Sequence, residues 1–216
     1  GLVLVEMLAQ PDCPSLDQKQ ELLQELLAFL MSCRSSRGQF HARYRLDDGS
    51  PFSDPSPYFD GESLLLLTRA ARVLGLTPYA VPASVAGDAM FKAYAQQAVE
   101  RQELSDTCKG FYQWGSMAFT ELYLFQPGEL RWIERTLAMA DWILDVHKVL
   151  GRKRNTGYAF EGLMSAYRLA HLAGSESTML RLRTAIEAGL GRLCTWQLGS
   201  SLQSAQLQAV LPRNPL

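Results

Sequence analysis

Two acidic residues, each directly before a glycine, are the side chains of this sequence best placed to do chemistry. Asp60 lies in YFDGESL (58–64) and Glu161 in AFEGLM (159–164), and an apolar run follows each glycine. A pair of carboxylates across a pocket can act as general acid and general base. An acid at the start of a helix is also favoured by capping and by the helix dipole. The motif therefore predicts a catalytic pair and leaves a purely structural role open.

A third copy of the pattern, YQWGSM (112–117), lies between the two acidic ones. The three glycines, Gly61, Gly115 and Gly162, are separated by 54 and then 47 residues. That spacing accommodates one helix running in and a second running back. The sequence therefore predicts a repeat of helical hairpins in which each first helix opens with the motif.

Aromatic and polar side chains surround these glycines and could contact a ligand together with the two acids. Tyrosine hydroxyls favour a wet or polar partner, and aromatic faces stack on sugars. The candidates for substrate binding are Tyr58, Phe59, Glu62, Tyr112, Gln113, Trp114 and Tyr158. Core packing is the competing interpretation for Trp114 and for Phe160, because both lie in apolar runs.

A strand-like excursion at residues 39–58 supplies two further candidates. His41, Arg43 and Arg45 alternate there with apolar residues, so they project to one face. On that face His41 could act as a general base and Arg43 could bind a carboxylate. The alternative is that all three side chains are simply exposed to solvent. The prolines after the turn predict an extended loop that ends where Asp60 or a neighbour caps the next helix.

Mostly apolar helices alternate with two-faced helices through the rest of the chain. Residues 64–74, 112–125 and 157–173 are apolar on most sides, whereas 16–34, 84–101, 129–150 and 176–198 have one polar face. The simplest packing places the apolar helices inside and the two-faced helices outside. The fold class predicted is all-α, built from helical hairpins.

This alternation resembles the (α/α) toroid families, in particular six-hairpin glycosidases, polysaccharide lyases and sugar epimerases. The resemblance implies a partial toroid over residues 15–199, with substrate held in a funnel at the starts of the inner helices. A closed ring of six hairpins would need about 300 residues, so the ring is either partial, completed by a partner protein or a further chain segment, or absent. Residues 1–14 are expected to form an extension containing a strand, Leu2 to Val5, and residues 200–216 an irregular tail.

Composition excludes several classes of function. A net charge of −1 disfavours nucleic acid, and no apolar run is long enough for a membrane span. The four cysteines lack metal-ligand spacing, and nucleotide, dinucleotide, zinc-protease and serine-hydrolase motifs are missing from the sequence. No metal and no cofactor is therefore expected. The basic loop Arg152-Lys153-Arg154 precedes an inner helix and would suit an acidic ligand, although a solvated loop is the alternative.

Three functions fit these patterns. The first is binding and processing of an oligo- or polysaccharide, acidic ones included, by hydrolysis, lyase cleavage or epimerisation. The second is a helical scaffold without catalysis that binds a protein or peptide. The third is a toroid of the terpenoid-cyclase or prenyltransferase type with an apolar pocket. The polarity of the pocket distinguishes them, and the cellular compartment is not indicated.

Overall fold

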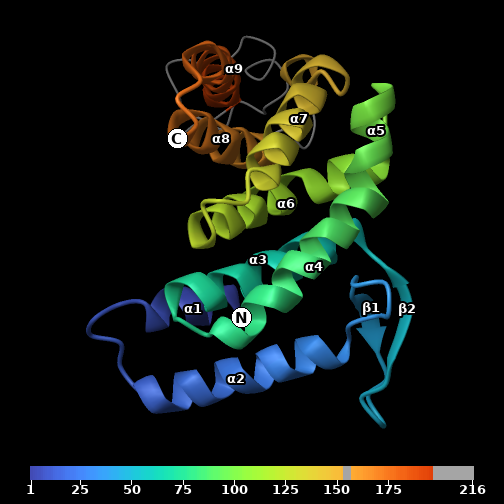
Figure 1. The fold of residues 1–216 in the computed structure, drawn as a ribbon, viewed down its shortest axis with the longest axis vertical. Helices are drawn as coiled ribbons and strands as arrows, with labels where there is room; N and C mark the ends of the chain where they lie inside the picture. The colour runs from blue at the N-terminus through green and yellow to red at the C-terminus, as the bar shows by residue number, and fades with distance from the viewer. Residues whose placement is uncertain (153–156, 197–216) are drawn as a thin grey trace, which may run out of the picture.

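A computed structural model describes residues 1–152 and 157–196 and shows an all-α fold with one short β-hairpin (Figure 1). The all-α class and the β excursion near residues 39–58 are thereby confirmed. None of the helices in these two ranges is long and apolar enough to cross a membrane. The expected tail at 200–216 and the basic residues Lys153 and Arg154 lie outside the described residues.

The N-terminal part contains two helices and the hairpin. Helix α1 spans Leu2–Leu8, so the prediction of a strand over Leu2 to Val5 was wrong. Val5 is fully buried there and its amide donates to the carbonyl of Gly1, which closes the first helical turn. Helix α2, Leu16–Ser32, follows, and β1, His41–Tyr44, pairs antiparallel with β2, Pro51–Pro55.

The proline-rich segment before Pro57 is therefore the second strand of a hairpin and not an unpaired loop. Pro51 and Pro55 occupy the two ends of β2. Proline is tolerated at strand ends and on edge strands, where its missing N–H removes no ladder hydrogen bond. The alternating pattern of the first strand was recognisable, whereas the prolines concealed its partner.

Three helical hairpins make up the remainder of the described residues. In the first, α3, Pro57–Val73, is followed by a return helix made of α4, Ala80–Met90, the π-helix η2, Phe91–Ala95, and α5, Gln96–Arg101. Helices α6, Asp106–Phe125, and α7, Arg131–Asp145, form the second. The third joins α8, Gly157–Leu172, to α9, Glu176–Cys194. Short 3₁₀ turns at Thr77–Tyr79 and Val149–Gly151 connect elements.

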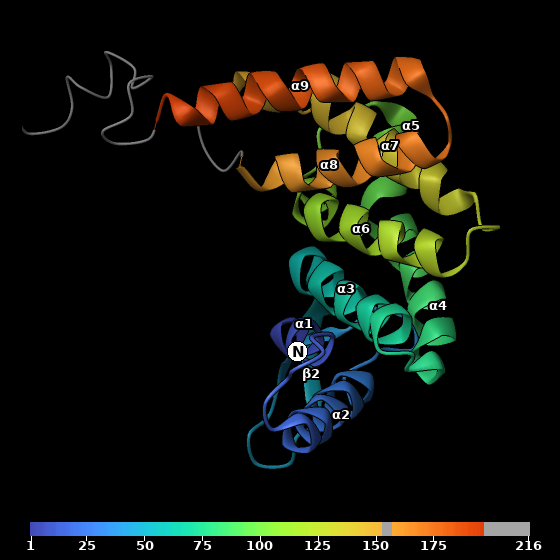
Figure 2. The same cartoon turned by 90° about the vertical axis from the view of Figure 1, so that its left-hand side faces the viewer.

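The first helices of the three hairpins lie side by side in the order α3, α6, α8 (Figure 2). Helices α4, α5 and α7 lie behind this row, and α9 packs along α8. We call α3, α6 and α8 the inner helices. Their amino-terminal ends meet at one edge, since Tyr58, Asp106 and Tyr158 line a common pocket. Within the described residues the row is open and does not close into a ring.

Two inner helices begin earlier than expected. Helix α3 begins at Pro57, with proline in the first turn, and Ser56 is its N-cap. The fixed φ of proline suits the first helical position, where an N–H would lack a partner anyway. Asp60 is therefore not the cap. Helix α6 begins at Asp106, and Ser105 accepts a hydrogen bond from the amide of Cys108 as its N-cap.

The motif glycines consequently lie within the helices, where they allow the inner helices to approach closely. A Cβ on Gly61 would lie 2.6 Å from the Cβ of Trp114, and one on Gly162 would lie 2.5 Å from Cε1 of Tyr112. Real Cβ atoms do not approach other atoms that closely. The repeated glycine thus reflects packing of α3 and α8 against α6, not a helix start.

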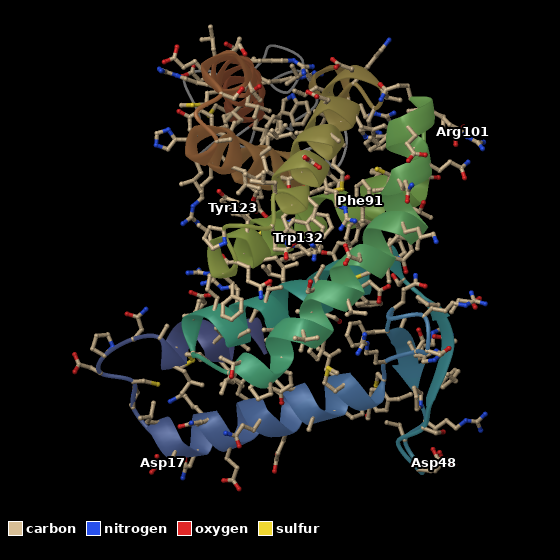
Figure 3. All side chains as sticks on the ribbon, in the orientation of Figure 1. Asp17, Asp48, Phe91, Arg101, Tyr123 and Trp132 are labelled. Atoms are coloured by element: carbon tan, nitrogen blue, oxygen red, sulfur yellow. The ribbon has the colours of Figure 1, made fainter. Side chains whose placement is uncertain are left out.

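The second layer packs on the first through aromatic rings and arginines. Phe119 of α6 contacts both Phe91 and Trp132, and Arg135 lies over the rings of Phe91 and Trp132. Figure 3 shows Phe91 and Trp132 at the junction of the return helix with α7. This cluster fixes the position of the outer helices, so it also fixes the inner row that they cover.

Candidate functional site

A pocket of about 540 Å³ lies where the amino-terminal ends of the inner helices meet. We call it the rim pocket. Its size is within the range of small-molecule sites. One tyrosine from α3, one from α8 and a polar segment of α6 form its wall. The lining residues are Tyr58, Asp106, Lys109, Gly110, Gln113 and Tyr158.

The two tyrosines of the rim pocket present aromatic surface from opposite sides of α6. Tyr58 is 47% exposed, and its ring meets that of Trp114 edge to face at a centroid distance of 6.0 Å. Tyr158 is partly buried, which raises the pKa of its hydroxyl, while the charge of Arg152 acts in the opposite direction. The Tyr158 hydroxyl therefore stays protonated at neutral pH and can donate a hydrogen bond.

Gln113 connects the rim pocket with a second hollow on the inner helices. Its side-chain amide donates a hydrogen bond of 2.5 Å to Oε2 of Glu161. Glu161 lines a groove of about 600 Å³ that runs along the inner helices toward their carboxyl-terminal ends. We call this hollow the inner groove. Gln113 thus holds the carboxylate of Glu161 just behind the wall of the rim pocket.

Positive charge gathers beside the rim pocket. Lys109 forms no ion pair within residues 1–152 and 157–196, and Arg152 donates from Nε to the carbonyl of His147. Burial lowers the pKa of His147 to about 4, and the charges of Arg152 and Lys109 contribute to that lowering. His147 is therefore neutral at pH 7. Of the predicted basic loop, Arg152 is the residue that the structure places near this pocket.

The sequence-predicted acid Asp60 is placed elsewhere. Its side chain is fully buried and accepts hydrogen bonds from the amide of Phe40, at 2.8 Å, and from the hydroxyl of Tyr94, at 2.6 Å. Gln39 in turn donates to the hydroxyl oxygen of Tyr94. The structure does not bring Asp60 and Glu161 to one pocket. Asp60 instead ties the π-helix and the residue directly before β1, Phe40, to α3.

Most of the other candidate residues also lie away from the rim pocket. Nδ1 of His41 bonds to the carbonyl of Ser53 across the hairpin at 2.7 Å, and Arg43 is exposed on β1. Phe59 is exposed, and Glu62 borders a different hollow beside α1 and α2. No cluster of metal-ligating side chains occurs in the ranges that the structure covers.

Two aromatic candidates are packing residues in this structure. The ring of Tyr112 is fully buried over Gly162, which raises the pKa of its hydroxyl far above the ordinary value. Trp114 packs over Gly61 and supports the ring of Tyr58 from behind. Tyr58, Gln113 and Tyr158 are therefore the predicted binding residues that line the rim pocket.

Sequence reasoning missed three lining residues, Asp106, Lys109 and Gly110. They belong to the first turns of α6, which was expected to begin at Tyr112. The pair Ser105-Asp106 carries the missing signal, because serine is a favoured N-cap and an acid is favoured in the first helical turn. A predicted start of α6 at Asp106 would have placed Lys109 and Gly110 in its first turns, at the same end of the inner helices as Tyr58.

The inner groove carries a buried ion-pair cluster at its far end. Glu121 on α6 is 5% exposed and pairs with Arg69 and Arg72 of α3. Arg69 also pairs with Glu6 of α1. These contacts neutralise the carboxylate and join three helices, so a structural role accounts for Glu121.

No protein-family model, no curated protein and no solved structure matches this chain.

Proposed function

We propose that the rim pocket binds a saccharide. The observation that supports this most directly is the convergence of two partly exposed tyrosines with Gln113, Asp106 and Lys109 in one pocket. Sugars stack their apolar faces on aromatic rings and use their hydroxyls as hydrogen-bond donors and acceptors. The pocket offers both kinds of surface within the dimensions of a sugar ring or two.

The polarity of the pocket favours this proposal over the alternatives. An isoprenoid would require a mostly apolar, aromatic cavity, whereas charged and amide groups line the rim pocket. A partial (α/α) toroid, the arrangement predicted from the sequence, would use the same end of its inner helices for substrate. Such a ring would be completed by a partner protein or a further chain segment.

An acidic saccharide suits the site better than a neutral one. Lys109 in the pocket wall and Arg152 nearby supply two positive charges, beside the carboxylates of Asp106 and of Glu161 behind Gln113. Glu161 already accepts a hydrogen bond from Gln113, whereas Lys109 forms no ion pair within the described residues. A sugar carboxylate could therefore form a charge-assisted hydrogen bond, which is stronger than a bond between neutral groups.

Processing of the bound sugar would use the acids nearest the pocket. Asp106 lines it, and Glu161 is held behind it by Gln113. Hydrolysis, lyase cleavage and epimerisation each need a positioned group that gives or takes a proton. We therefore propose Asp106 with Glu161 as the acidic pair, in place of the expected pair Asp60 and Glu161.

Binding to a panel of neutral and uronic-acid oligosaccharides tests the proposal, measured by calorimetry and followed by product analysis. Tyr58→Ala and Tyr158→Ala should each weaken binding about tenfold, the loss expected for one stacking residue of about 1.4 kcal/mol. Tyr44→Ala is the matched control, because Tyr44 is also 47% exposed and lies on the β-hairpin.

Equal loss in the Tyr44 variant, or no binding by any glycan, would contradict the rim-pocket assignment. The second candidate function would then be the protein-binding scaffold. The inner groove favours it, because an open hollow of about 600 Å³ between three helices could receive a peptide.

A further inference from the structure

One side of α8 carries exposed residues at helical spacing that no other described element covers. Glu161, Met164, Arg168 and Leu172 follow each other at intervals of three or four residues, and all four are exposed. Residues at that spacing form one stripe along a helix. We call these four residues the α8 stripe. Its two apolar members are about half exposed, Met164 at 50% and Leu172 at 48%.

The charges of the α8 stripe are arranged so that the stripe is complementary to a reversed copy of itself. Glu161 and Arg168 are seven residues apart, nearly two turns, or about 10 Å along the axis. Their midpoint falls between Met164 and Ser165. If a second α8 lies antiparallel across this midpoint, each Glu161 faces an Arg168 and the two Met164 side chains meet at the centre.

The surroundings of the stripe are compatible with such a contact. Arg168 forms no ion pair with any residue the structure describes, and Glu161 has Gln113 as its hydrogen-bond donor, with a second carboxylate oxygen remaining. Glu161, Met164 and Arg168 also line the inner groove, where the partly exposed Met117 of α6 adds apolar surface. Methionine side chains adapt well to a partner surface because they are unbranched and flexible.

We propose that the chain forms a two-fold symmetric dimer through the α8 stripe, with two symmetry-related ion pairs between Glu161 and the partner's Arg168. A two-fold axis produces self-complementary contacts of this kind, in which residue i meets j and j meets i. The proposal concerns an assembly surface and does not depend on saccharide binding in the rim pocket.

The test is a charge-reversal cycle followed by sedimentation velocity over a range of protein concentrations. Arg168→Glu and Glu161→Arg should each weaken the dimer at least about tenfold, because each places like charges opposite one another. The double variant Glu161→Arg with Arg168→Glu should restore the wild-type dissociation constant, because the pairs form again with reversed sign.

The matched control is Glu187→Arg on α9. Glu187 is exposed and pairs with Arg183 four residues earlier on its own helix, so its reversal should leave dimerisation unchanged. Circular dichroism melts confirm that each variant is folded. The proposal would be overturned if the wild type is monomeric at the highest concentrations tested. It would also be overturned if neither single charge reversal changes the dissociation constant of the dimer. Loss of the dimer with intact glycan binding in the Arg168→Glu variant, whose side chain lies outside the rim pocket, would support the proposal and leave the rim-pocket function standing.

Discussion

Asp60 and Glu161 occupy the same place in the repeated motif, one residue before its glycine, yet the structure gives them opposite environments. Asp60 is fully buried in a hydrogen-bonded network with Phe40 and Tyr94. Glu161 is exposed on the inner-helix face and bonds to Gln113. A shared motif position therefore does not fix the side of a helix to which a residue points.

The reason lies in how the glycines pack. Gly61 of α3 and Gly162 of α8 both face α6, which lies between these two helices. They therefore point in opposite directions along the row. The preceding residue on each helix is rotated by about 100° in the same sense. One rotation directs Asp60 toward the outer layer, and the other directs Glu161 toward the open face.

Truncating the two acids should give the largest contrast. Asp60→Ala removes the acceptor for a buried amide and a buried hydroxyl, so it should lower the free energy of unfolding by about 3 kcal/mol. Glu161→Ala should change it by less than about 0.5 kcal/mol, since the residue is exposed. Urea denaturation of the two variants measures both values. A loss of comparable size in both would contradict the difference in environment.

The pH dependence of stability should separate the two acids next. Burial raises the pKa of Asp60 to about 6, against about 3.9 in an unfolded chain. Between these values the folded state binds more protons, so stability falls as pH rises from about 4 to about 6, by about 2 to 3 kcal/mol in all.

Asp60→Asn isolates this contribution in urea titrations from about pH 4 to about pH 7. The stability of the variant must be subtracted from that of the wild type at each pH. His147 also titrates in this range, and its lowered pKa makes stability rise with pH, the opposite of the Asp60 effect. If the difference in stability between the wild type and the Asp60→Asn variant does not change with pH, the carboxyl does not titrate as its burial indicates.

The glycine packing itself can be tested with two substitutions of equal chemistry. Gly162→Ala places a methyl group against the Tyr112 ring and should destabilise the protein by about 2 kcal/mol, within the usual range for overpacking. Gly191→Ala on α9 meets nothing within 4 Å and should stabilise it by about 0.5 to 1 kcal/mol. Thermal and urea denaturation measure both, and the same sign for both would refute close approach of α8 to α6.

The smallest expected effect concerns charge at the rim pocket. Lys109→Gln should reduce affinity for a uronic-acid oligosaccharide about five-fold, roughly 1 kcal/mol, and leave a neutral analogue unaffected. Lys92→Gln is the control, because Lys92 is exposed on the return helix. Calorimetry at low and high salt measures the change. Equal loss for both sugars would remove the argument for an acidic ligand.

The sequence predicted the helical hairpins because hydrophobic periodicity reports directly which face of a helix is buried. It also located Tyr58, Gln113 and Tyr158, which the structure brings to one pocket. It could not orient Asp60, because the direction of that side chain depends on which side of α3 meets α6. Nor did it show the partners of Asp60, which lie 20 and 34 residues away along the chain.

The remaining differences between prediction and structure concern where helices begin and where their geometry changes. They arise from local sequence signals that the prediction did not use. Pro57 was taken for part of an extended loop, although proline is equally suited to the first turn of a helix. The start of α6 at Asp106 was overlooked because polar residues precede its apolar stretch. The π-helix at Phe91–Ala95 has no signal in the periodicity, yet it carries Tyr94 to Asp60.

The Asp60 network has a consequence for how the molecule opens. Its hydrogen bonds join the segment directly before β1 (Gln39 and Phe40), α3 and the return helix, three segments that lie apart in the chain. The Phe40 amide can exchange its hydrogen with solvent only when the carboxylate releases it. Its exchange rate therefore reports the cooperative opening of these three segments as one unit.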